Sequence, residues 1–165
     1  MDSTAESAKE KWYKEGLRFE CQGSGKCCTS RGEYGYVYLT LEDRRRMAQA
    51  LGLRTSQFTR TYCTQTEGQW HLKDNPKSPD CIFLEDNKCS VYAGRPTQCR
   101  TWPFWPENMQ AKNWRQDVAQ FCPGVDRGRL YSAPEIDQIV EAQRQSEASL
   151  QGVRRDSLSF SLKVL

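Results

Sequence analysis

Eight cysteines in a chain of 165 residues constrain the fold more than any other feature of this sequence. Only 37% of the residues are hydrophobic, so we expect cross-links or metal to supplement a modest core. Residues 1–20 carry many charges and no apolar run, so we expect no signal peptide, and the chain holds no Asn-X-Ser/Thr acceptor. We therefore expect a cytoplasmic protein. In that reducing compartment, clustered cysteines more often bind metal or catalyse reactions than form disulfides.

The composition excludes several classes of protein. The 24 Lys and Arg nearly balance the 21 Asp and Glu, and a net charge of +3 argues against a nucleic-acid partner. No stretch approaches the roughly 20 apolar residues that cross a bilayer, so we expect no membrane partner. We predict a single small α+β domain over residues 1–152, cysteine-rich and stabilised by metal, followed by a C-terminal tail over 153–165. Short strands, a β-hairpin and three to four helices should build it.

Local patterns place these elements along the chain. Helices are predicted where a capping residue precedes apolar positions, as at Thr40 with Asp43 and at Ser132 with Glu135. The expected helices cover residues 5–15, 41–51, 56–63 and 132–150. The expected strands cover 17–21, 36–39 and the two arms of a hairpin within 81–92, and the alternation of Leu158, Phe160 and Leu162 is compatible with an edge strand. Three prolines exclude one regular helix over residues 93–106.

Seven of the eight cysteines are candidate metal ligands. A hairpin over residues 81–92 would bring Cys81 and Cys89 together at its ends, and thiolates that converge from several segments form a site for a soft metal. Disulfides and plain buried thiols are the alternatives. Cys63 lies apart in a segment expected to be helical, and we interpret it as a small buried hydrophobic residue. The candidate ligands are Cys21, Cys27, Cys28, Cys81, Cys89, Cys99 and Cys122.

The choice of metal lies between zinc and iron. An all-thiolate site suits Zn²⁺ and iron–sulfur clusters about equally. Apart from the adjacent pair Cys27 and Cys28, the sequence lacks the short C-x(2–4)-C spacing of structural zinc sites. His71 is the only histidine, which excludes a Cys2His2 site, and we expect it to lie on a strand face. Cys122-Pro123 is similar to the Cys-Pro end of bacterial ferredoxin motifs, so an iron–sulfur cluster, such as 4Fe–4S, is favoured.

The residues around the cysteines suit a metal site. Gly23-Ser24-Gly25 can direct backbone N–H groups at sulfur. We expect Arg95 and Arg100 to offset the negative charge of the thiolates through N–H···S hydrogen bonds. Four aromatic residues either exclude solvent from the site or form ordinary core, namely Trp102, Phe104, Trp105 and Trp114.

Three stretches carry a resemblance to a known family: GKCC at 25–28, CIFLEDNKCSVYAGRPTQCRTWPFWPE at 81–107 and CPGVDRGRLYSAPEI at 122–136. They resemble the YkgJ-type cysteine-cluster family, the CxxCxxCC group, whose members are described as zinc- or iron-chelating domains. The resemblance covers about residues 18–140 and implies metal chelation by the seven candidate cysteines. Cys63 falls where no family cysteine is expected. A flagellin lysine methylase is a distant, larger relative.

Two functions of different classes follow from these observations. The first is a metal-binding protein that holds iron or zinc through clustered thiolates. The second is an iron–sulfur-dependent redox or group-transfer enzyme, which the surplus of cysteines and the methylase relative favour. The segment GSGK at 23–26 is not a phosphate loop, because Glu20 and Cys27 occupy positions that need Gly and Ser or Thr. Whether the protein is an enzyme, and which catalytic residues or protein partner it uses, stays open at this point.

Overall fold

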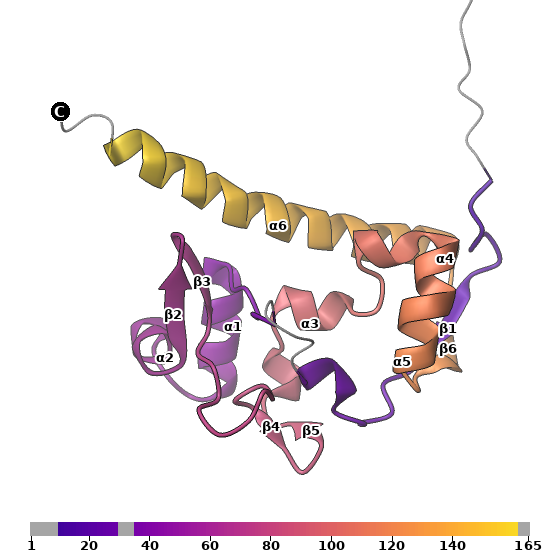
Figure 1. Cartoon of the computed structure of the whole chain (residues 1–165), viewed down its shortest axis with the longest axis horizontal. Helices are drawn as coiled ribbons and strands as arrows, with labels where there is room; N and C mark the ends of the chain where they lie inside the picture. Colours follow the sequence, from indigo (N-terminus) through magenta and orange to yellow (C-terminus); the bar gives the residue numbers. More distant parts are fainter. Residues whose placement is uncertain (1–9, 30–34, 162–165) are drawn as a thin grey trace, which may run out of the picture.

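The computed structural model describes residues 10–29 and 35–161, the last ten of them by backbone alone. Within these ranges the chain forms one small α+β domain of helices and three two-stranded antiparallel sheets (Figure 1). The strands are β1 (Leu17–Phe19), β2 (Cys63–Thr66), β3 (Gln69–Leu72), β4 (Leu84–Glu85), β5 (Lys88–Cys89) and β6 (Val125–Tyr131). The α-helices are α1 (Leu41–Ala50), α2 (Thr55–Tyr62), α3 (Thr97–Thr101), α4 (Ala111–Asn113), α5 (Ala119–Phe121) and α6 (Ala133–Ser161). Shorter helical turns are η1 (Lys26–Cys28), η2 (Tyr92–Gly94) and η3 (Pro106–Met109), and the π-helical η4 (Trp114–Val118) joins α4 to α5.

The two helices with a capping signature begin where the sequence predicts. At the start of α1, the Thr40 hydroxyl accepts a hydrogen bond from the Asp43 N–H at 3.1 Å, and the Asp43 carboxylate accepts one from the Thr40 N–H at 3.0 Å. At the start of α6, Glu135 accepts a hydrogen bond from the Ser132 N–H at 2.8 Å. The helix α6 continues to Ser161, so the tail expected from residue 153 is helical that far.

The edge strand considered for residues 158–162 is therefore wrong over the residues described, because 158–161 belong to α6. Leu162 lies outside the described residues. Of the helix expected over 5–15, residues 5–9 also lie outside them, and residues 12–15 form a turn instead.

The hairpin expected within residues 81–92 is confirmed as β4 and β5. Asp86 and Asn87 take φ angles of +48° and +62°, the left-handed pair that a tight two-residue hairpin turn requires. The strand expected at 17–21 appears as β1, which pairs with β6, a strand that the sequence analysis missed.

A second hairpin, β2 and β3, was also missed. It corrects the expectation for Cys63, which begins β2 instead of lying within a helix, because α2 ends at Tyr62. The segment expected as a strand over 36–39 runs beside β3, where Tyr38 forms an isolated bridge with His71.

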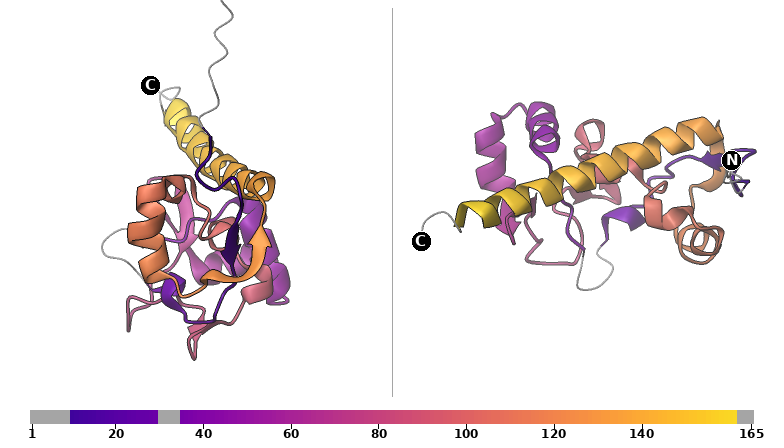
Figure 2. Two further views of the ribbon diagram at one scale, coloured as in Figure 1. Left: turned by 90° about the vertical axis from the view of Figure 1, so that its right-hand side faces the viewer. Right: turned by 90° about the horizontal axis from the view of Figure 1, so that it is seen from above.

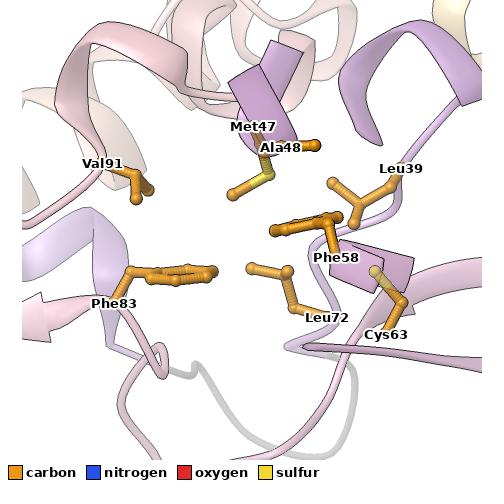
Figure 3. Close-up of a cluster of buried hydrophobic side chains, with 8 residues drawn as sticks. All are labelled: Leu39, Met47, Ala48, Phe58, Cys63, Leu72, Phe83 and Val91. Atoms are coloured by element: carbon orange, nitrogen blue, oxygen red, sulfur yellow. The ribbon is translucent and has the colours of Figure 1, made fainter. Parts of the chain in front are cut away.

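Two hydrophobic clusters form the interior. Core 1 packs α1, α2, β3 and the 83–91 region around Leu39, Met47, Ala48, Phe58, Cys63, Leu72, Phe83 and Val91 (Figure 3). Core 2 packs the β1–β6 ribbon, η4 and the first turns of α6 around Tyr13, Phe104, Trp114, Val118, Val125, Ile136 and Val140.

The long helix α6 connects the two halves of the molecule. It begins beside β6 and runs along the molecule to the region of β2 and β3 (Figures 1 and 2). It contacts α3, where the Thr101 hydroxyl bonds to Gln143 Oε1 at 2.8 Å, and it also contacts η3 and β3. None of the helices within the described residues combines the length and apolar character needed to cross a membrane.

Candidate metal centre

Six of the seven candidate thiols line a single pocket of about 760 Å³. These six are Cys21, Cys27, Cys28, Cys81, Cys89 and Cys99. The pocket lies between the two cores, because Met47, Leu72, Phe83 and Val91 of core 1 line it together with Trp102, which packs against core 2. Cys122 does not line the pocket and packs against core 2.

Backbone hydrogen bonds connect the segments that carry three of these thiols. The Cys81 N–H donates to the Cys28 carbonyl at 2.7 Å, and the Leu84 N–H donates to the Cys81 carbonyl at 2.9 Å. Leu84 in turn pairs with Cys89 across the β4–β5 hairpin. The short turn η1 is thereby held against the hairpin, with Cys28, Cys81 and Cys89 on adjoining segments.

Gly25 allows this close approach between η1 and the hairpin. It caps η1 with a φ of +69°, a conformation that glycine adopts without strain. A Cβ atom there would lie 3.1 Å from the Asn87 carbonyl oxygen and 3.1 Å from Leu84 Cδ1. A larger residue would therefore push η1, and the two thiols on it, away from the hairpin.

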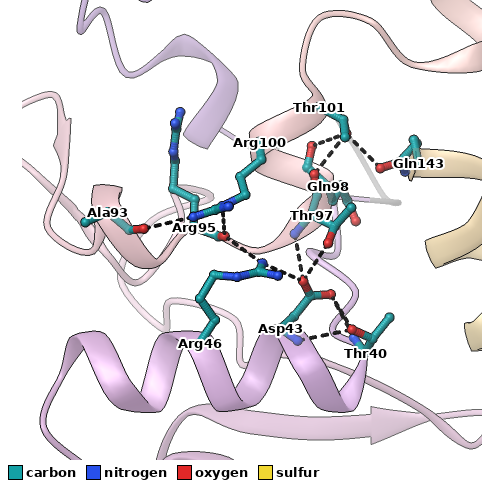
Figure 4. A network of polar contacts seen from close by, with 10 residues as sticks. All are labelled: Thr40, Asp43, Arg46, Ala93, Arg95, Thr97, Gln98, Arg100, Thr101 and Gln143. Carbon is teal, nitrogen blue, oxygen red and sulfur yellow. Dashed lines mark hydrogen bonds and ion pairs between the residues drawn. The ribbon is translucent and has the colours of Figure 1, made fainter. Parts of the chain in front are cut away.

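The two arginines expected near the thiols have different surroundings. Arg95 lines the pocket, its Nε donates to the Tyr92 carbonyl at 3.0 Å, and its guanidinium lies 3.6 Å from the centre of the Tyr92 ring. Arg100 does not line the pocket and donates instead to the carbonyls of Arg95 and Ala93, at 2.9 and 3.1 Å (Figure 4). Only Arg95 is brought to the thiols.

The four aromatic residues divide between the two roles considered for them. Trp102 and Trp105 line the pocket and meet edge to face, with ring centres 4.8 Å apart. Phe104 and Trp114 stack 5.7 Å apart inside core 2. Further aromatic residues of the pocket wall, which sequence patterns did not reveal, are Tyr36, Tyr92 and Phe121.

The thiols act on one another electrostatically. A hydrogen bond from the Cys28 thiol lowers the pKa of Cys27 to about 6, and the nearby charge of Arg95 also lowers it. The same hydrogen bond, together with burial, raises the pKa of Cys28. Burial chiefly raises the pKa values of Cys81, Cys89 and Cys99, and the charges of neighbouring cysteines raise them further.

The electrostatic effects connect most of the pocket thiols. Cys27, Cys81, Cys89 and Cys99 interact electrostatically in every pairwise combination. Cys28 interacts with Cys27, Cys81 and Cys99, and Cys21, which is exposed like Cys27, acts on Cys89.

The thiols share a pocket but do not form a closed cage. In the part of the chain that the structure describes, no three Cys, His, Asp or Glu side chains form a group that could hold a metal ion as they lie. The donor chemistry nevertheless fits a soft metal, because six thiol groups and the cation of Arg95 line one pocket. Binding a metal there requires the sulfur atoms to move together.

His71 and Cys63, which the sequence does not assign to the metal site, do not line the pocket. His71 is buried, with Nε2 bonded to the Thr66 hydroxyl at 2.8 Å and Nδ1 to the Leu72 carbonyl at 2.7 Å. Cys63 is buried in core 1, which confirms its expected burial, and burial raises its pKa to about 11.

A family model described as "Putative zinc- or iron-chelating domain", CxxCxxCC, matches residues 20–123. This range contains all six pocket thiols and Cys122, and the match confirms the resemblance seen in the sequence. It supports metal binding by this chain. No solved structure matches the chain.

Proposed function

Because the chain belongs to the CxxCxxCC domain family, we propose that its pocket thiols hold iron in an iron–sulfur cluster. The observation that carries the proposal is the gathering of six thiols from η1, the hairpin, α3 and the segment after β1 around one pocket. Thiolates are the ligands of such clusters, which can store and pass electrons.

The spacing of the thiols along the chain favours a cluster over a structural zinc site. Structural zinc sites usually draw on C-x(2–4)-C pairs, whereas among the six pocket thiols only the adjacent Cys27 and Cys28 lie so near each other in sequence.

We assign the ligand role to Cys27, Cys81, Cys89 and Cys99. These four line the pocket from η1, the β4–β5 hairpin region and α3, and backbone hydrogen bonds hold η1 against the hairpin region. Cys28 and Cys21 would lie beside the bound group. The geometry does not support the ligand role expected for Cys122, which faces core 2.

Arg95 would support the bound group by its charge. Thiolate ligation leaves net negative charge in the pocket, and a guanidinium close to the sulfur atoms offsets it. Trp102 and Trp105 would restrict the access of water on one side of the pocket.

Anaerobic purification of the full chain tests this proposal directly. Iron, acid-labile sulfide and zinc are measured per chain beside the visible spectrum. Iron and sulfide in equal amounts with broad visible absorbance are expected. Colourless protein with stoichiometric zinc would make the thiol pocket a zinc site and the cluster wrong, and protein without bound metal would contradict both.

The same pocket favours a second candidate, an iron–sulfur-dependent redox or group-transfer enzyme. Its volume falls within the roughly 300–1,000 Å³ of small-molecule sites, and aromatic residues form part of its wall. A redox role requires that the visible spectrum bleach with dithionite and return in air-free oxidant, whereas a purely structural group would not cycle reversibly.

A further inference from the structure

Asp43 connects the start of α1 to the segment that carries Cys99. Its side chain is fully buried, with an exposed fraction of 0%. Sequence patterns account for it only as the third residue of a helix-capping box. Such a cap uses one carboxylate oxygen, and the other oxygen contacts a different element.

The two carboxylate oxygens of Asp43 serve different elements. Oδ2 accepts hydrogen bonds from the Thr40 N–H at 3.0 Å and the Thr40 hydroxyl at 2.8 Å, which completes the cap of α1. Oδ1 accepts hydrogen bonds from the Thr97 N–H and the Thr97 hydroxyl, each at 2.8 Å (Figure 4). Thr97 is the first residue of α3, two positions before Cys99.

Asp43 also controls the position of Arg95 through Arg46. The Arg46 Nη1 lies 3.2 Å from Asp43 Oδ1 and donates to the Arg95 carbonyl at 3.3 Å (Figure 4). One buried carboxylate thus fixes the backbone on both sides of Pro96, with a pocket arginine before it and a pocket thiol after it.

We propose that Asp43 is a positioning residue of the metal centre, holding Cys99 and Arg95 in place without touching the metal. This inference rests on the proposed function, in which Cys99 is a ligand. Groups that orient metal ligands from outside typically change metal affinity about 10- to 100-fold when they are removed.

The chemistry of the site makes Asp43→Asn a sharp test. All five groups that the carboxylate accepts from are N–H or O–H donors. An amide presents its own NH₂ to some of these donors, whichever way it is turned, so hydrogen bonds are lost at little change in size. Thr97→Val removes only the hydroxyl donor and keeps the N–H donor, and Thr97→Ser keeps a hydroxyl at this position.

The chain offers a matched control in its second capping box. Glu135 accepts hydrogen bonds from the Ser132 N–H and hydroxyl at the start of α6 and pairs with Arg129, and these partners lie outside α3 and the pocket. Glu135→Gln therefore weakens a helix cap and a partly exposed ion pair without reaching the pocket.

The experiment measures the rate at which excess EDTA removes metal from the anaerobically purified full-length variants, with the melting temperature of each metal-free form. We expect Asp43→Asn to lose metal about 10- to 100-fold faster than the parent and Thr97→Val to lose it at an intermediate rate. Thr97→Ser and Glu135→Gln should lose metal at the parent rate.

Parent-like metal loss in Asp43→Asn would overturn the inference, as would equal acceleration by Glu135→Gln. Should Asp43→Asn fail to fold, the parent rate in Thr97→Val would overturn it instead. Cys99→Ser is measured alongside: if that variant keeps its metal, the proposed ligand set has failed. If Cys99→Ser loses its metal while the Asp43 and Thr97 variants keep it like the parent, the positioning role of Asp43 is wrong and the ligand role of Cys99 stands.

Discussion

Cys63 and Cys99 have different surroundings in the fold. Cys63 is 5% exposed within core 1, beside Phe58 and Leu72, whereas Cys99 lines the pocket with five other thiols. The sequence suggested this division, because Cys99 lies in the stretch RPTQCR and Cys63 stands apart from the other cysteines.

The first prediction compares serine at these two positions. Cys99→Ser should lose bound metal, because a hydroxyl is a poor ligand for a soft metal. Cys63→Ser should keep the metal stoichiometry of the parent and lose about 1–3 kcal/mol of stability, since it places a hydroxyl in an apolar core. Metal per chain and chemical denaturation measure the two effects. Equal metal loss in both variants would mean that Cys63 is also a ligand.

The second prediction compares Arg95 with Arg100. Arg95→Ala should weaken metal retention about tenfold, because it removes the cation that lines the pocket. Arg100→Ala removes the same charge but only releases the carbonyls of Ala93 and Arg95, so metal should be held nearly as in the parent. Competition with a chelator measures both. A larger loss of metal from Arg100→Ala than from Arg95→Ala would contradict this prediction and favour the hydrogen bond from Arg100 to sulfur that we expected from the sequence.

At the scale of elements, local signals explain which parts of the fold were predictable. The helix α1 and the start of α6 carry capping boxes, and the β4–β5 hairpin has a polar turn between two short strands. The strand β6 has no such local signal. Its sequence, VDRGRLY, is mostly exposed, and its partner β1 lies more than a hundred residues earlier in the chain. Nothing local predicts that pairing.

The candidate site divides in the same way. The clustering of cysteines in the sequence was enough to predict the six thiols that line the pocket, because cysteine is itself a common metal-binding residue type. The position of Cys122 against core 2 and the different contacts of Arg95 and Arg100 depend on how distant segments pack. The role of Asp43 was hidden for the same reason, since its bond to Thr97 spans 54 positions.

The third prediction tests the contact between η1 and the hairpin. Gly25→Ala places a methyl group against the Asn87 carbonyl and Leu84, so it should separate the thiols of η1 from Cys81 and Cys89 and lower metal content. Gly23→Ala is the control, because Gly23 has a similar φ of +63° but no atom within 4 Å of its added Cβ. Each variant bears backbone strain of about 1–2 kcal/mol. Metal per chain should fall in Gly25→Ala only, and equal values would contradict the contact.

At the scale of the whole molecule, the pocket lies between two small cores that α6 connects. Residues of core 1 form one side of the pocket, and Trp102, packed on core 2, forms part of the other. A metal bound by thiols of η1, the hairpin and α3 would act as a cross-link between them. Because only 37% of the residues are hydrophobic, we expect the folded state to depend on this metal cross-link.

The fourth prediction is that metal removal lowers the melting temperature. A ligand at about 1,000 times its Kd stabilises the folded state by about 4 kcal/mol. For a chain of this size each kcal/mol shifts Tm by roughly 2–4 °C, so the metal-free form should melt roughly 8–16 °C lower. Calorimetry before and after anaerobic chelation, with reloading of the metal as control, measures the shift. An unchanged Tm would show that the two cores hold together without metal.

The central claim is that the thiolates of this pocket are the ligands of the bound metal. X-ray absorption at the metal edge of the purified parent protein reports those ligands directly. We predict a first shell of sulfur alone, at about 2.3 Å for zinc, with a second metal shell if the group is a cluster. A first shell containing nitrogen or oxygen ligands from the protein would contradict the account.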